Sequence, residues 1–371
     1  MIRRSFSRLR LLLMLLAAVP LAAQTPTRLP ADKVEKIEAV ITAAMARENI
    51  PGLSVAIVAD HQLRFANGYG FADLENKVPA KATTVYRLAS ISKTITAVAV
   101  MQLAERGQLD LDAPIEKYCP AFPEKRWPIT ARQLLAHLGG IRHYKSRNES
   151  NSTRHYPSLV AGLAMFKHDP LLHEPGTKFH YTTFGYSLLG CALQGASGMS
   201  YMDYVRENIF RPAAMVRMRA DNVYEIIPNR AQGYRQTQSG ELRNSSLADT
   251  SYKIPGGGLC STVEDLAKFA LALQTAALVK QETLEQMWTP QKTRDDQQIR
   301  RRGAASYGLG WSLVERNGRK EVGHGGAQQR VSTFLYMLPE EEFALVLMVN
   351  LEGIGSRLRV LARQIADIVL E

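Results

Sequence analysis

Cysteine is scarce in this sequence of 371 residues, which contains only Cys119, Cys191 and Cys260. An odd number of widely separated cysteines excludes a dense disulfide framework and allows at most one intramolecular bridge. The segments around Cys191 and Cys260 are apolar, which is typical of buried free thiols. No histidine lies at metal-ligand spacing from these cysteines, and there is no His-x-x-Glu-His motif. We therefore expect no metal and no organic cofactor.

Long apolar runs are also scarce. The one near the N-terminus, from Leu11 to Leu21, follows a basic segment and precedes small residues. This order is typical of a secretory signal with cleavage near Ala23, and an uncleaved membrane anchor is the alternative. No later segment is long and apolar enough to span a bilayer. We therefore expect a periplasmic or secreted protein, with residues 1–23 as the signal and 24–371 as the mature chain.

The sequence has no basic stripe interleaved with aromatic residues, which make up 8% of the chain. The formal net charge is +11, and it falls to +7 without the four arginines of the signal segment. The densest basic patch, Arg300–Arg302, lies in a polar stretch and is expected to be a solvated loop. This charge suits solubility or an anionic cell surface, and we expect no nucleic-acid partner.

Apolar periodicity predicts strands near both ends of the mature chain and helices between them. A helical pattern at 31–48 is followed by strand-like runs at 53–59 and 62–70. Asn317-Gly318 is a strong hairpin signal between two later strands. The elements predicted near the C-terminus are strands at 307–315, 319–322, 330–337 and 343–350, and a helix at 356–370.

These elements predict one domain of the α+β class, an α/β sandwich. Both ends of the mature chain, about 31–85 and 300–371, would form one antiparallel sheet flanked by the terminal helices. An all-helical insertion, about 90–290, would lie on one side of the sheet. The cleft between the two parts is the natural place for a site.

The segment from Arg87 to Leu103 carries the strongest chemical signal. Its apolar residues recur at helical spacing, so we expect a mostly buried helix that begins near Ser90. Ser90 and Lys93 would then share one helix face. A helix N-terminus favours negative charge on the hydroxyl oxygen, and a lysine in apolar surroundings is easily neutralised. The pair is therefore a candidate nucleophile and amine; an N-cap serine beside a surface lysine is the alternative.

Three motifs extend this signal: Ser-Ile-Ser-Lys at 90–93, Tyr-Thr-Thr at 181–183 and His-Gly-Gly at 324–326. Their order and approximate spacing resemble those of the serine β-lactamase-like and penicillin-binding superfamily, in particular its class C β-lactamase and DD-peptidase branch. The segment Ile129–Tyr144 is similar to that of the mitochondrial β-lactamase-like serine proteases. The resemblance covers nearly the whole mature chain and implies a β-lactamase/transpeptidase-like fold.

The resemblance implies catalytic roles for three residues. Ser90 would attack a carbonyl and form an acyl-enzyme. Lys93 would take the serine proton or prepare Tyr181 to do so, the assignment of the base being open. Tyr181 would pass a proton to the leaving group.

Further residues are implied in oxyanion and substrate binding. The backbone N–H of Ala327 would hold the oxyanion together with that of the nucleophile. Gly325 and Gly326 would let the substrate backbone approach the strand closely. His143 and Tyr144 are candidate residues of the cleft wall.

Two positions depart from the family pattern. Thr183 stands where many relatives carry asparagine, and it lacks the amide that would bond a substrate amide. His324 stands where β-lactamases and penicillin-binding proteins carry lysine, so a cation facing a substrate carboxylate would depend on pH. Both departures favour a peptidase or esterase over an enzyme that acts on penicillins or cell-wall peptides.

We therefore predict an exported serine hydrolase that works through an acyl-serine intermediate and cleaves peptides. An esterase or β-lactamase of the same fold is the alternative among enzymes. A non-catalytic binding or polymer-forming protein is the alternative of another class, against which the intact serine, lysine and tyrosine argue. The expected partner is a peptide or ester substrate, and the sequence leaves the oligomeric state open.

Overall fold

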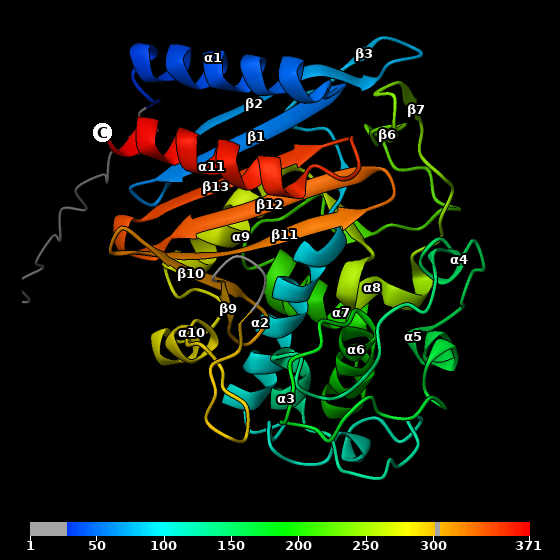
Figure 1. The fold of residues 1–371 in the computed structure, drawn as a ribbon. Helices are drawn as coiled ribbons and strands as arrows, with labels where there is room; N and C mark the ends of the chain where they lie inside the picture. Colours follow the sequence, from blue (N-terminus) through cyan, green and yellow to red (C-terminus); the bar gives the residue numbers. More distant parts are fainter. Residues whose placement is uncertain (1–27, 301–304) are drawn as a thin grey trace, which may run out of the picture.

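The computed structural model describes residues 28–300 and 305–371. The expected signal segment, together with Arg301 and Arg302 of the basic patch, lies outside the described residues. An eight-stranded antiparallel sheet runs in the order β3-β2-β1-β13-β12-β11-β10-β9. The N-terminal and C-terminal ends of the domain thus form one sheet, and the predicted fold class is confirmed (Figure 1).

The strands of this sheet include the runs that the apolar pattern predicts. Central strands β1 and β13 are buried along their whole length, as expected for strands whose two faces are both covered. They pair from Leu53 opposite Val349 to Val58 opposite Ala344. The strands are β1 (Gly52–Ala59), β2 (Gln62–Asp73), β3 (Val78–Pro79), β9 (Ser306–Tyr307), β10 (Ser312–Arg316), β11 (Arg319–Gln328), β12 (Val331–Leu338) and β13 (Phe343–Val349).

Terminal helices cover one face of the sheet. Helices α1 (Ala31–Glu48) and α11 (Gly355–Leu370) lie side by side there (Figure 1). The buried residues of α11 recur every three or four positions, which gives the helix one apolar face against the strands. Helix α9 (Val263–Gln274) packs against β1 and β13, and its apolar residues belong to the hydrophobic core that also contains the helical part.

The helical part surrounds α2 (Ser92–Glu105), which is buried on all sides from Ser92 to Leu103. The 3₁₀ turn η1 (Ala89–Ile91) precedes it, so the helix predicted near Ser90 begins with a tighter turn. Its other helices are α3 (Ala131–Leu135), α4 (Arg147–Ser150), α5 (Leu159–Gly162), α6 (Phe184–Ser197), α7 (Tyr201–Val205), α8 (Ile254–Gly257) and α10 (Gln281–Met287).

Short elements complete the described chain. Two small sheets have the orders β4-β8-β5 and β6-β7. Their strands are β4 (Tyr86–Arg87), β5 (Arg219–Ala220), β6 (Tyr234–Gln236), β7 (Leu242–Asn244) and β8 (Leu259–Ser261). The 3₁₀ turns are η2 (Ile115–Lys117), η3 (Leu163–Met165), η5 (Ser251–Lys253) and η6 (Pro339–Glu341), and η4 (Arg206–Phe210) is a π-helical segment.

The strand predicted at 307–315 is interrupted between β9 and β10. Gly308 N–H donates to Trp311 O at 2.8 Å, and Gly310 has a φ of 93°. A Cβ at Gly310 would lie 2.4 Å from the Cβ of Ala97 in α2. The chain therefore turns here because it packs directly on the buried helix, a contact that strand periodicity does not reveal.

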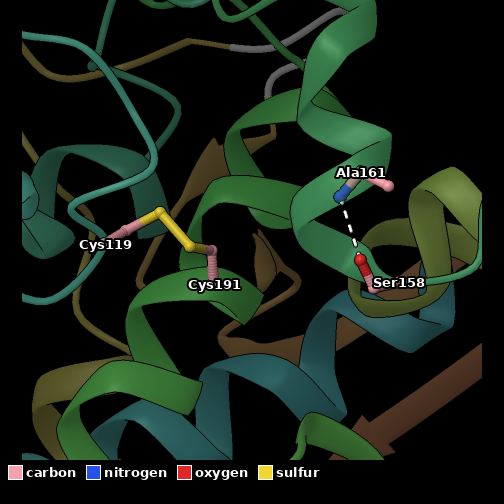
Figure 2. The surroundings of a disulfide bond; sticks show 4 residues. All are labelled: Cys119, Ser158, Ala161 and Cys191. Atoms are coloured by element: carbon pink, nitrogen blue, oxygen red, sulfur yellow. Dashed lines mark hydrogen bonds between the residues drawn. A yellow bond between two sulfur atoms is a disulfide. The ribbon is translucent and has the colours of Figure 1, made fainter.

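The cysteines correct one expectation. Cys191 is not a free thiol, because it forms a disulfide with Cys119 (Figure 2). Cys119 follows η2, and Cys191 lies in α6. Apolar surroundings suit a buried thiol and a buried disulfide equally, so the sequence context did not distinguish them. Cys260 is buried and free, and the limit of one bridge holds.

Candidate active site

Ser90 lies in the turn η1, which is held against the sheet. The preceding residue, Ala89, has a left-handed φ of 48°, which residues with a side chain rarely adopt. Thr333 Oγ1 donates to Leu88 O at 3.0 Å. A Cβ at Gly326 would lie 2.4 Å from that same carbonyl oxygen. The close packing of β11 and β12 on the turn therefore fixes the backbone that presents the serine hydroxyl.

Lys93 is fully buried one helical turn after the serine. Its Nζ lies 3.2 Å from Ser90 Oγ, 3.3 Å from Thr183 Oγ1 and 2.6 Å from Gly256 O. Burial of an amine is costly unless it is hydrogen-bonded, and these three contacts supply the bonds. The three-residue spacing seen in the sequence thus becomes a direct contact between hydroxyl and amine.

Tyr181 and Thr183 approach this pair from the start of α6. The ring centroid of Tyr181 is 4.9 Å from Lys93 Nζ. Thr183 is the N-cap residue of the helix, and its hydroxyl is one of the three groups around the amine. The structure therefore brings together Ser90, Lys93, Tyr181 and Thr183 from two distant segments of the chain.

A cavity of about 350 Å³ opens in front of the serine. Its walls come from η1, the loop after α3, the start of α6, the segment η5–α8 and the end of β11. Predicted site residues that line it are Ser90, His143, Tyr144, Tyr181, Thr183, Gly325 and Ala327.

His143 and Tyr144 form an uncharged wall of this cavity. His143 Nδ1 accepts a hydrogen bond from the backbone N–H of Thr183 at 3.3 Å, so a neutral ring carries its proton on Nε2. Burial and, next, the charge of Lys93 lower the pKa of His143 to about 3. Burial also raises the pKa of Tyr144 above its ordinary value. At neutral pH both side chains are therefore neutral polar groups.

The three positions of the third motif differ in their placement. Gly325 and Ala327 line the cavity, as expected for residues that meet a substrate. Gly326 is buried, and a Cβ there would lie 2.1 Å from Thr333 Oγ1. A glycine is needed at this position because β11 packs closely on β12 and η1. It does not serve the approach of substrate.

The structure does not place His324 in the cavity wall, because its side chain is fully buried. Its Nδ1 lies 2.8 Å from Gly325 O, and its Nε2 lies 3.0 Å from the hydroxyl of Tyr307. That hydroxyl is also 3.2 Å from Nε2 of His137. Since a carbonyl only accepts, Nδ1 of His324 donates. The ring therefore belongs to a buried polar chain beside Tyr181, and it does not face the substrate as the resemblance implied.

Sequence reasoning missed Lys253, which lines the same cavity. The residue is 2% exposed and directly precedes α8, whose Gly256 carbonyl contacts Lys93. Burial, reinforced by the nearby charge of Arg87, lowers the pKa of Lys253 to about 7. The available signal was a lysine beside the apolar, glycine-rich run Ile254–Leu259, but no spacing linked it to Ser90.

Two negative observations concern the described residues. No group of three or more His, Cys, Asp or Glu side chains among them could hold a metal ion. Within the same ranges, every helix is too short or too polar to cross a bilayer.

The fold combines an antiparallel sheet with a helical part, and a buried lysine contacts a serine at the cavity. This arrangement is that of a serine hydrolase with a β-lactamase-type fold. The family model described as Beta-lactamase matches residues 37–370, and the chain belongs to this family. Its relatives include the human mitochondrial serine beta-lactamase-like protein LACTB, with 30% identity over 87% of this chain and 76% of the relative. Protein flp of Staphylococcus aureus is 27% identical over 88% of this chain and 65% of its own length.

Solved structures give the same result. The octameric penicillin-binding protein homologue from Pyrococcus abyssi superposes with a TM-score of 0.78 and 28% identity, over 91% of this chain and 77% of that one. The D-amino acid amidase from Ochrobactrum anthropi has the same TM-score at 23% identity, over 92% and 99%. The predicted membership of the β-lactamase-like superfamily is thereby confirmed.

Proposed function

We propose that this serine hydrolase is an exported peptidase that acts through an acyl-serine intermediate at Ser90. The observation that carries the proposal is the 3.2 Å contact between Ser90 Oγ and the buried Nζ of Lys93. In its deprotonated form, the amine of Lys93 can donate to Gly256 O and Thr183 Oγ1 and direct its lone pair toward the serine proton. Lys93 is therefore the base that activates the nucleophile.

In the first half-reaction, Ser90 Oγ bonds to the substrate carbonyl carbon while its proton passes to Lys93. The carbonyl oxygen becomes an oxyanion, for which the N–H groups of Ser90 and Ala327 are the donors. The C–N bond then breaks as the leaving nitrogen receives a proton through Tyr181. In the second half-reaction, water attacks the acyl-serine ester, and the serine regains its proton.

Cleavage of an amide is favoured by the position of Tyr181. An amine leaves only with a proton, whereas the alkoxide of an ester needs less help. The ring of Tyr181 lies beside Lys93, and its hydroxyl is the group that we assign to pass the serine proton to the leaving group. The fold is also that of a D-amino acid amidase, which gives the scaffold a precedent for amide cleavage.

Export is supported by the disulfide between Cys119 and Cys191. Disulfides persist in oxidising compartments and are rare in the reducing cytosol. The signal-like segment at residues 1–23 agrees with this setting. Mass spectrometry of the protein recovered from the periplasm or medium of an expressing cell tests the expected cleavage near Ala23.

Covalent labelling tests the catalytic proposal. The mature chain is exposed to a fluorophosphonate and, separately, to a penicillin, with Ser90→Ala as the matched control, and intact masses are recorded. We expect one fluorophosphonate adduct on the wild type, none on Ser90→Ala, and no stable penicillin adduct. A stable penicillin adduct would indicate a cell-wall target, and absence of both adducts would favour a binding or assembly protein.

A matched substrate pair then separates peptidase from esterase. Peptide p-nitroanilides and p-nitrophenyl esters with the same acyl group are compared on wild type and Ser90→Ala. A peptidase cleaves both substrates, whereas an esterase cleaves only the ester. Turnover of the ester alone would replace the peptidase assignment with that of an esterase.

A further inference from the structure

Lys253 lies in the catalytic cavity, yet the proposed mechanism gives it no task. Among the described residues that line the cavity, it is the only charged one, since His143 is neutral at pH 7. Lys253 is 2% exposed and makes no hydrogen bond or ion pair with any described residue. Lys93, by contrast, has three hydrogen-bond partners. Because Lys253 lines the cavity and has no acceptor among the described residues, its amine is available to a ligand that enters there.

A second donor of the same cavity also lacks a partner. The side-chain nitrogen of Gln328 is buried without a hydrogen-bond partner among the described residues, and Gln328 lines the cavity with Lys253. None of the described residues that line this cavity is an aspartate or glutamate. Two unused donors and no competing carboxylate suit an anion with two oxygen atoms.

We propose that Lys253, assisted by Gln328, binds a carboxylate of the substrate inside the catalytic cavity. This inference rests on the proposed function and names its substrate class: peptides that carry a carboxylate near the scissile bond. The resemblance placed such a cation at position 324. Because the side chain of His324 is fully buried, the cation that faces the cavity comes from η5 instead.

Two aromatic rings lie close to the amine of Lys253. Its Nζ lies 5.4 Å from the ring centroid of Tyr144 and 5.2 Å from that of Tyr252, distances that suit attraction between a cation and an aromatic face. Burial lowers its pKa to about 7, and a bound carboxylate would raise it again. The charged and titratable groups that face it are Arg87 from β4, Asp221 after β5, Asp249 before η5, Tyr252 within η5, and His143 and Tyr144 from the loop after α3.

A binding measurement on Ser90→Ala tests this assignment independently of catalysis. Acetyl-alanyl-alanine and its C-terminal amide differ only in the carboxylate, and each is titrated by calorimetry or NMR. We expect the acid to bind about ten- to a hundredfold more tightly than the amide, as hydrogen bonds to a charged group imply. Equal affinity of acid and amide would overturn the inference, while failure of the wild type to label would overturn only the proposed function.

Variants in the same background assign the effect to the side chain. Lys253→Met should remove the preference for the acid, Lys253→Arg should retain most of it, and Gln328→Ala should reduce it by about threefold to tenfold. Lys268→Met is the matched control, because it removes one positive charge on α9 outside the cavity. Thermal unfolding verifies that each variant is folded. An unchanged preference in folded Lys253→Met would assign the carboxylate to another group.

Proton uptake gives a readout that a purely structural lysine would not change. At pH 8, above its pKa of about 7, Lys253 is largely neutral in the free cavity. Binding of the acid should then draw a proton to the amine, whereas binding of the amide should not. Calorimetry in two buffers of different ionisation enthalpy measures this uptake, and no uptake with the acid at pH 8 would contradict the proposal.

Discussion

Two buried lysines lie at the catalytic cavity, and their environments differ. Lys93 has a serine hydroxyl, a threonine hydroxyl and a carbonyl oxygen around its Nζ. Lys253 has two aromatic rings near its Nζ and no hydrogen-bond partner among the described residues. A fully hydrogen-bonded amine is set in one position, as a base requires, whereas an amine without acceptors is available to a ligand. The comparison distinguishes Lys93, which we propose as the base, from Lys253, which we propose as the residue that binds the substrate carboxylate.

The two lysines are also linked through the backbone. Lys253 ends η5, and four residues of α8 follow it directly. Within that helix, Gly256 supplies the carbonyl oxygen 2.6 Å from Lys93 Nζ. One short segment therefore contacts the amine that we propose as the base and carries the amine that we assign to substrate binding.

Exchange of the lysines for methionine is the strongest test of this distinction. Lys93→Met should lower the rate of fluorophosphonate labelling by about a hundred- to ten-thousandfold, because general-base help is lost. Lys253→Met should leave the labelling rate by a neutral fluorophosphonate within about threefold, because recognition of a carboxylate is not needed there. Stopped-flow or gel-based labelling rates measure both. Equal losses in the two variants would erase the distinction between them.

Gly256, whose carbonyl oxygen contacts Lys93, provides a second test. A Cβ at Gly256 would lie 2.8 Å from both Cγ2 and the carbonyl oxygen of Thr183, so Gly256→Ala must shift one of these groups. We expect kcat/KM to fall by about tenfold, since the acceptor of Lys93 moves. Gly355→Ala is the matched control, because open space surrounds that glycine at the start of α11. An unaltered kcat/KM in Gly256→Ala would show that the carbonyl contact does not position the base.

The sequence predicted much of the site around the serine but not Lys253. Ser90 and Lys93 are close in sequence, and helical periodicity alone predicts that they share a face. Tyr181 and Ala327 required the family resemblance, because long-range contacts leave no local pattern. Lys253 has no such motif, and only the packing of η5 and α8 reveals that it faces the cavity.

For the fold, the strength of the local pattern decided what could be predicted. The apolar runs that became β1 and β13 predicted strands, and the predicted helix at 31–48 has the bounds of α1. The break between β9 and β10 was missed, because it depends on the contact of Gly310 with α2. His324 was assigned from its motif, but its burial depends on Tyr307 and His137, which a motif does not describe.

The pH dependence of stability sharpens the comparison further. In the unfolded chain Lys253 titrates near 10.5, and in the folded chain its pKa is about 7. Between these values the unfolded state binds more protons, so this group makes the free energy of unfolding rise with pH. Lys253→Met removes the cost of the buried charge. It should therefore stabilise the protein, by a few kcal/mol at most at pH 6 and by less as the pH approaches 10.

Thermal or denaturant unfolding of wild type and Lys253→Met at pH 6, 8 and 9.5 measures this trend. Lys268→Met should show no comparable dependence, because Lys268 is partly exposed and hydrogen-bonded to Ala214 O. A stabilising loss of a cavity lysine would identify Lys253 as a residue whose charge is retained for binding at the expense of stability. Destabilisation by several kcal/mol at every pH would instead indicate a packing role.

The disulfide should have the smallest effect on activity. It joins Cys119 to Cys191, which are 72 residues apart. Cys191 lies in α6, the helix whose N-cap residue Thr183 contacts Lys93. Cys119→Ala/Cys191→Ala should lower the free energy of unfolding by about 2–4 kcal/mol, because the unfolded chain gains freedom. At 25 °C kcat/KM should change less than twofold, since buried packing and hydrogen bonds hold both lysines in place. Wild type under reducing conditions is the control for lost side-chain volume. If both samples lost activity and carboxylate preference together, the disulfide, and not the local contacts, would be what holds Lys93 and Lys253 in position.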